Sequence, residues 1–110
     1  MVCEGGMRRA AKIDANHNEI VDALRSVGAS VQSLASAGNG VPDLLVGHRH
    51  KTYLLEVKDG SKPPSARELT PDQAKWHSEW WGGPCIVVNS VSEALTAIDV
   101  HITTTQVIND

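Results

Sequence analysis

Two carboxylates and an ammonium group stand at the ends of two strand-like segments. Asp43 lies near the start of the apolar segment 41–47, and Glu56 and Lys58 lie near the end of the segment 52–58. A short stretch of turn-forming and charged residues separates the segments, which predicts an antiparallel hairpin. Such a hairpin brings Asp43 close to Glu56 and Lys58.

These charged groups have two interpretations. Because side chains alternate along a strand, Glu56 and Lys58 project from one face and Val57 from the other. Charged groups resist burial unless they are paired or bound to a metal. A solvated surface or one plain salt bridge would explain them, and so would a site built to bind a cation.

The spacing of these residues resembles a known signature. Val-Pro-Asp at 41–43 is followed by Glu-Val-Lys at 56–58, as in the PD-(D/E)XK nuclease superfamily. Within it, the sequence is most similar to small VRR-type nuclease and Holliday junction resolvase-like domains of phage type, over residues 16–98. The resemblance implies a metal-dependent DNA endonuclease that hydrolyses phosphodiester bonds in recombination, repair or replication. Selectivity for junctions or branched DNA is one option.

The resemblance also implies a role for each of these residues. Asp43, Glu56 and the main-chain carbonyl of Val57 would hold Mg²⁺ or Mn²⁺, which prefer hard oxygen ligands. The metal would polarise the phosphoryl oxygen and acidify a water for attack. Lys58 would orient that water or stabilise the developing negative charge.

Two further residues are catalytic candidates. Apolar residues spaced by three and four predict a helix over 14–27, and Glu19 borders its buried stripe. Glu19 is therefore either a surface residue or the first-helix glutamate of the resembled families. Thr70-Pro-Asp-Gln73 is a helix start in which Gln73 completes a capping box. The resemblance gives Gln73 a second role, as a polar active-site residue.

The basic residues are candidates for phosphate contacts. The net charge of −3 is unlike that of a general polyanion binder, so local distribution matters. Solvated surface charge is the alternative for each candidate. The nucleic-acid-binding candidates are Lys62 and Arg67 in the loop 59–68, Lys75 and Arg49.

Histidines suggest a competing metal site. His48 and His50 in the hairpin turn, with His17 and His77 elsewhere, are possible transition-metal ligands. The sequence has no second paired cluster and no His-Glu-x-x-His arrangement, so zinc is disfavoured.

The elements that position these residues follow from periodicity and caps. They predict an α/β fold with a four-stranded mixed sheet flanked by helices. The order of elements matches the restriction-endonuclease-like αβββαβ core that the resemblance implies. The expected strands are 29–35 at the sheet edge, 41–47, 52–58 and 85–89, the last buried on both faces and parallel to its neighbour. The crossover helix is expected over 70–81, and a last helix follows a cap at Ser90 or Ser92. The three tryptophans 76, 80 and 81 are expected in the core, with 76 and 80 stacked.

The chain divides into a nuclease domain and two terminal segments. Residues 1–12 are expected to be flexible or a short basic helix, 13–99 the domain, and 100–110 a tail. No apolar run approaches the ~20 residues of a membrane span, and the N-terminus lacks a signal-peptide core, so the cytoplasm is the expected location. Cys3 and Cys85 are expected to be reduced.

Three functional classes remain open at this point. The first is the DNA endonuclease, in which a homodimer would suit symmetric cutting. The second is a nucleic-acid-binding module that keeps the fold without cutting, and the full set of Asp43, Glu56 and Lys58 favours the first over it. The third is a nuclease subunit active only with a helicase or other partner.

Overall fold

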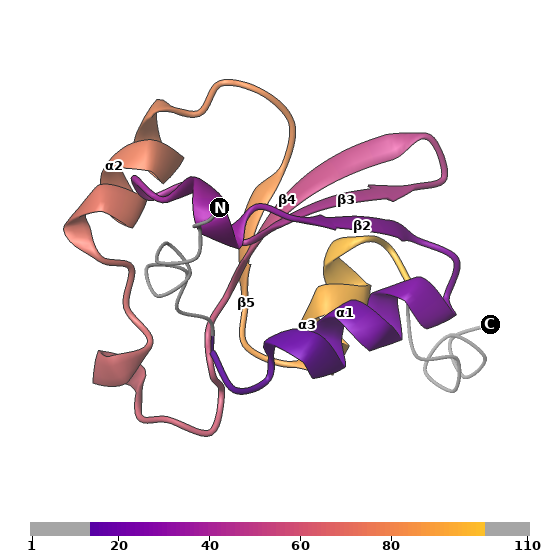
Figure 1. Ribbon diagram of the computed structural model, residues 1–110, viewed down its shortest axis with the longest axis horizontal. Coiled ribbons are helices and arrows are strands. Elements are labelled where there is room, and N and C mark those ends of the chain that lie inside the picture. Colours follow the sequence, from indigo (N-terminus) through magenta and orange to yellow (C-terminus); the bar gives the residue numbers. More distant parts are fainter. Residues whose placement is uncertain (1–13, 101–110) are drawn as a thin grey trace, which may run out of the picture.

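A hairpin of two strands forms the centre of the computed structural model, which describes residues 14–100 (Figure 1). Strand β3 (Leu44–His48) pairs antiparallel with β4 (Lys51–Val57), in a register that sets His48 opposite Lys51. The two loop residues Arg49 and His50 have φ of 53° and 67°. Positive φ at both positions is what a tight two-residue hairpin turn requires.

The hairpin belongs to a four-stranded sheet in the order β2-β3-β4-β5. Strand β2 (Ser30–Ser33) pairs antiparallel with β3, and β5 (Cys85–Val88) pairs parallel with β4. The predicted mixed sheet with a crossover helix before its last strand is confirmed, as is the edge position of β2. Since β5 is the other edge, its first three residues are only half-buried, and the expected burial on both faces is wrong.

Two of the strands are shorter than predicted, because a proline and a 3₁₀ turn interrupt the predicted segments. The segment 41–47 becomes β3 only from Leu44, because Pro42 has no N–H for the ladder. Asp43 therefore stands just before the strand. A 3₁₀ turn, η2 (Ala35–Ala37), shortens the predicted strand 29–35. A second one, η3 (Pro64–Ala66), lies inside the loop 59–68.

Helices α1 (His17–Ser26) and α3 (Val91–Ala97) pack together against one face of the sheet (Figure 1). Ser90 caps α3 by accepting a hydrogen bond from the N–H of Glu93, so Ser90 and not Ser92 is the cap. The core between these helices and the sheet includes Ile20, Leu24, Leu44, Val46, Leu55, Val57, Val88 and Ile98. This apolar layer leaves the other face of β4 for Leu54 and Glu56, and Lys58 follows directly after the strand.

Helix α2 (Pro71–Glu79) lies on that other face and stands apart from the core (Figure 1). It ends at Glu79, two residues before the predicted end, and buries none of its residues. Trp76 and Trp80 do stack, with ring centroids 4.9 Å apart. However, Trp80 is 41% exposed and Trp81 97% exposed, so the prediction of core tryptophans is wrong. Trp76 and Trp80 therefore pack on each other outside the core.

The predicted terminal segments 1–12 and, beyond Val100, 101–110 lie outside the described residues. Cys3 lies there too, and Cys85 is a free thiol within the described part. None of the helices in residues 14–100 has the length and apolarity to cross a membrane.

Candidate active site

The hairpin brings Asp43 and Glu56 together at its open end. One carboxylate oxygen of Asp43, Oδ2, accepts a hydrogen bond of 2.8 Å from the main-chain N–H of Val57. This bond ties the residue before β3 to the end of β4, directly beside Glu56. Lys58, one residue beyond β4, places its Nζ 3.9 Å from Oε2 of Glu56. The structure therefore brings the three residues of the sequence signature to one point.

Glu56 is a buried acid in an environment that disfavours its charge. Its side chain is 2% exposed. Burial is the largest cause and the nearby charge of Asp43 the second, and together they raise the pKa of Glu56 from 4.5 to about 8, while the positive charge of Lys58 opposes the rise. The two carboxylates are therefore more stable when they share a proton or bind a cation than when both are ionised without a partner.

The oxygen atoms of this pair fit a hard divalent cation. Oε1 of Glu56 is buried and has no hydrogen-bond partner among the described residues. An orphaned buried carboxylate oxygen is costly unless something positive binds it. Within residues 14–100 no three His, Cys, Asp or Glu side chains form a metal-binding group, so two carboxylates are the side-chain donors here. Mg²⁺ is normally held by one or two carboxylates together with water and phosphate.

Gln73 joins Glu56 and Lys58 to the start of α2. Its Oε1 accepts hydrogen bonds from Lys58 Nζ at 2.8 Å and from the N–H of Thr70 at 2.9 Å. Since Oε1 is committed to these donors, its Nε2 points to Glu56 and donates to Oε2 at 3.0 Å. The Thr70 hydroxyl in turn accepts from the N–H of Gln73, which completes the predicted capping box. The cap and the site therefore use the same side chain.

Replacing Gln73 with alanine is expected to weaken both the helix and the site. The change removes the side chain that accepts the N–H of Thr70 in the capping box. It also removes the hydrogen bonds that the Gln73 amide makes to the buried Lys58 and Glu56 side chains. We expect a loss of about 2 kcal/mol in the free energy of unfolding, measured by urea denaturation. Gln32→Ala is the matched control, because Gln32 is exposed on the edge strand and, within residues 14–100, its amide donates to the adjacent Ser33 carbonyl alone. Equal losses of unfolding free energy in the two variants would mean that the hydrogen bonds of Gln73 do not stabilise the fold.

Gly40 permits α2 to dock beside Asp43. Its φ is +83°, and a Cβ atom there would lie 2.2 Å from the main-chain oxygen of Asp72 and 2.9 Å from the nitrogen of Gln73. The loop before Asp43 therefore runs against the backbone of the first turn of α2. Only glycine allows this approach, and the approach fixes the distance between Gln73 and the carboxylate pair.

Gly40→Ala is expected to displace α2 and to lower stability by roughly 2–3 kcal/mol, from a positive φ and a backbone clash together. Gly38→Ala isolates the first effect, because Gly38 has φ +70° with open space around its Cβ position. That control should lose only about 1 kcal/mol. Denaturation of the two variants side by side measures the difference. Equal losses would mean that the contact with Asp72 does not constrain the helix.

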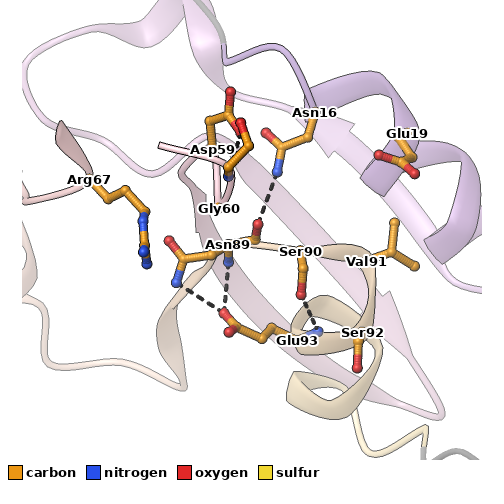
Figure 2. Close-up of a pocket in the computed structure, with 11 residues that line it drawn as sticks. Asn16, Glu19, Asp59, Gly60, Arg67, Asn89, Ser90, Val91, Ser92 and Glu93 are labelled. Atoms are coloured by element: carbon orange, nitrogen blue, oxygen red, sulfur yellow. Dashed lines mark hydrogen bonds between the residues drawn. The ribbon is translucent and has the colours of Figure 1, made fainter. Parts of the chain in front are cut away.

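A polar hollow of about 540 Å³ is lined by residues of α1, of the loop after Lys58 and of the start of α3 (Figure 2). Asn16, the residue before α1, donates through Nδ2 to the main-chain oxygens of Lys58 at 3.1 Å and Asn89 at 3.2 Å. Figure 2 shows Glu19 on α1 at this hollow, with Asp59, Arg67, Asn89 and Glu93 around it. Glu19 is thus placed with the hollow and not with the hydrogen-bond network of Gln73.

Asp14, in the segment before α1, also influences the carboxylate pair. The negative charge of Asp14 adds to the rise in the pKa of Glu56, after the larger effects of burial and Asp43. Asp14 was not predicted as a site residue, because the periodicity of the helix does not show the two long-range bonds of Asn16 that bring the preceding residues toward Lys58.

The basic candidates are dispersed. Lys62 Nζ lies 4.0 Å from Asp14 Oδ1, and Nε of Arg67 donates to the Lys62 carbonyl at 2.7 Å, so this pair borders the site. Lys75 forms an exposed ion pair of 3.8 Å with Glu79 on α2. Arg49 is in the hairpin turn, and the five residue steps along β4 from Lys51 to Glu56 place that turn about 17 Å from the carboxylates. The structure therefore does not bring Arg49 to the others.

The histidines do not form a zinc site in the part of the chain that the structure describes. His77 lies one turn after Gln73 on α2, and its Nδ1 is 3.5 Å from the Cys85 sulfur. Burial lowers the pKa of His77, and the positive charge of Lys58 adds to this effect. Burial and the charge of Glu56 raise the pKa of the Cys85 thiol. A neutral His–Cys pair therefore borders the site.

Comparison with known proteins gives one structural relative. No family model and no curated protein matches the sequence. A solved structure titled "VRR_NUC domain" is similar to the chain, with 26% sequence identity and a TM-score of 0.52. The likeness covers 90% of this chain and 97% of that chain.

Proposed function

We propose that this chain, a VRR-NUC nuclease-like domain of the PD-(D/E)XK type, is a metal-dependent DNA endonuclease that hydrolyses phosphodiester bonds. The resemblance found in the sequence is confirmed by the structural relative, and the match indicates a nuclease domain. The observation that carries the proposal is the buried Glu56 oxygen without a partner, beside Asp43 and Lys58.

Each side chain has a role in this proposal. Asp43 and Glu56, with the main-chain carbonyl of Val57, hold Mg²⁺ or Mn²⁺, and a metal bound there supplies Lewis-acid activation of water and phosphate. Lys58 directs its ammonium group to the phosphate oxygens and stabilises charge that develops on them. Gln73 is a positioning residue, because it holds both Lys58 and Glu56.

Lys62 and Arg67 are proposed as phosphate contacts, since they border the site from the loop after β4. Lys75 is proposed as a more distant contact. Branched or junction DNA is the proposed substrate class, with a role in recombination, repair or replication, as the VRR-type and resolvase-like resemblance suggests. A homodimer, a helicase partner and a phage setting are proposed on the same basis.

Incubation with supercoiled plasmid and with branched DNA tests the activity. Nicking is expected with Mg²⁺ or Mn²⁺, and none is expected with EDTA. Lys58→Ala should lower the nicking rate on the order of a hundredfold. Nicking unchanged in this variant would contradict the assignment. No nicking of any DNA form by the wild-type chain would favour the non-cleaving module, unless addition of a partner restored it.

A further inference from the structure

An apolar hollow of about 180 Å³ lies on the face of the sheet that also carries Glu56. Leu54 lines it, and Leu54 is two residues before Glu56 on β4. Residues two apart on a strand point to the same side, about 7 Å from each other. The hollow is thus the immediate neighbour of the carboxylate pair. Its lining residues are Leu45, Thr52, Leu54, Trp80, Gly83 and Pro84.

The indole of Trp80 forms a fixed wall of this hollow. It stacks on Trp76 with an interplanar angle of 16°, and its Nε1 donates to the Gly83 carbonyl at 2.9 Å. Gly82 lies so close that a Cβ there would be 2.4 Å from the ring. Trp80 nevertheless remains 41% exposed. An aromatic side chain held by three neighbours and left open to solvent is preorganised to bind a planar group.

We propose that this hollow binds an unpaired nucleobase of the DNA strand being cut. The inference rests on the proposed function, because a strand with a phosphate at Asp43 and Glu56 must place a neighbouring base nearby. Aromatic side chains bind bases of single strands by stacking, independently of sequence. In a paired duplex the base would first have to leave its stack, which favours unpaired or branched DNA.

A second copy of the chain is the competing occupant. A stable protein interface buries about 800 Å² on each partner. Over residues 14–100, the exposed large apolar side chains are Leu45, Trp80 and Trp81. Three such side chains offer less apolar surface than an interface of this size needs. The hollow is small and adjoins polar site residues, so a single base suits it better than a protein surface.

Binding of single-stranded DNA without divalent metal tests the proposal. The protein is the full chain carrying Asp43→Asn, so that no cleavage occurs. The probes are a labelled oligothymidylate and an abasic deoxyribose-phosphate oligomer of the same length, which carry equal charge. Fluorescence anisotropy should show the oligothymidylate bound about tenfold tighter. Trp80→Ala should remove this difference, and so should Leu45→Gln, which keeps a side chain of similar size should Trp80→Ala fail to fold.

Trp81→Ala is the matched control, since it removes an adjacent, more exposed indole that does not line the hollow. It should keep the preference for bases. Equal binding of the two oligomers, or loss of the preference in Trp81→Ala alone, would overturn the proposal. So would a dimer in sedimentation that Trp80→Ala dissociates. Plasmid nicking by the wild-type chain is scored separately, so the nuclease function can stand while the base site fails, and the reverse.

Discussion

Asp43→Asn is expected to lower the rate of DNA cleavage by on the order of a thousandfold, because it removes a negative ligand from a two-carboxylate site. The asparagine oxygen can still accept the N–H of Val57, so the link between the two strands survives. The loss should therefore be one of chemistry and not of folding. Single-turnover cleavage at saturating Mn²⁺ measures it.

Asp22→Asn is the control for this experiment, since Asp22 lies on the exposed side of α1. It should cleave at the wild-type rate. Circular dichroism should show both variants folded. Cleavage by Asp43→Asn within tenfold of wild type would place the reaction elsewhere on the chain.

Glu56→Gln is expected to stabilise the metal-free chain at alkaline pH. The pKa of Glu56 is about 8 in the folded chain and 4.5 without its surroundings. Between these values the unfolded chain has released a proton that the folded chain keeps, so the free energy of unfolding falls as pH rises from about 4.5 through about 8. Glutamine has no proton to lose, and it can still accept from Gln73. The variant should gain on the order of 3 kcal/mol over wild type by pH 9.

Urea denaturation across this pH range, with chelator present, measures the effect. Glu68→Gln is the control, because Glu68 is an exposed loop residue whose variant should follow the wild-type curve. Divalent metal should reverse the order at alkaline pH, since it binds the ionised wild-type pair better than the variant. Parallel curves for Glu56→Gln and wild type without metal would mean that Glu56 is not held in its protonated form.

The sheet and most helix boundaries were predictable because their signals are local. Alternation placed Glu56 and Lys58 on one face, and the caps at Thr70 and Ser90 marked two helix starts. The position of Arg49 could also have been derived from the hairpin, since a turn and the open end of the same hairpin are necessarily far apart.

The remaining differences depend on contacts between distant parts of the chain. Asn16 donates hydrogen bonds to the main chain of Lys58 and of Asn89, which are 42 and 73 positions further along the chain. No local pattern in the sequence reveals that these bonds bring Asp14 toward Glu56. The tryptophan spacing correctly predicted a stack between Trp76 and Trp80. It could not show that α2 meets the sheet through its polar first turn, which leaves Trp80 and Trp81 exposed.

Anomalous diffraction from crystals soaked in Mn²⁺ tests the central claim most directly. The account predicts one manganese peak about 2.1 Å from a carboxylate oxygen of Asp43 and from the buried Oε1 of Glu56. That peak should vanish in crystals of Asp43→Asn. No peak at this pair, or a peak only at the acidic residues of the hollow in Figure 2, would contradict the account.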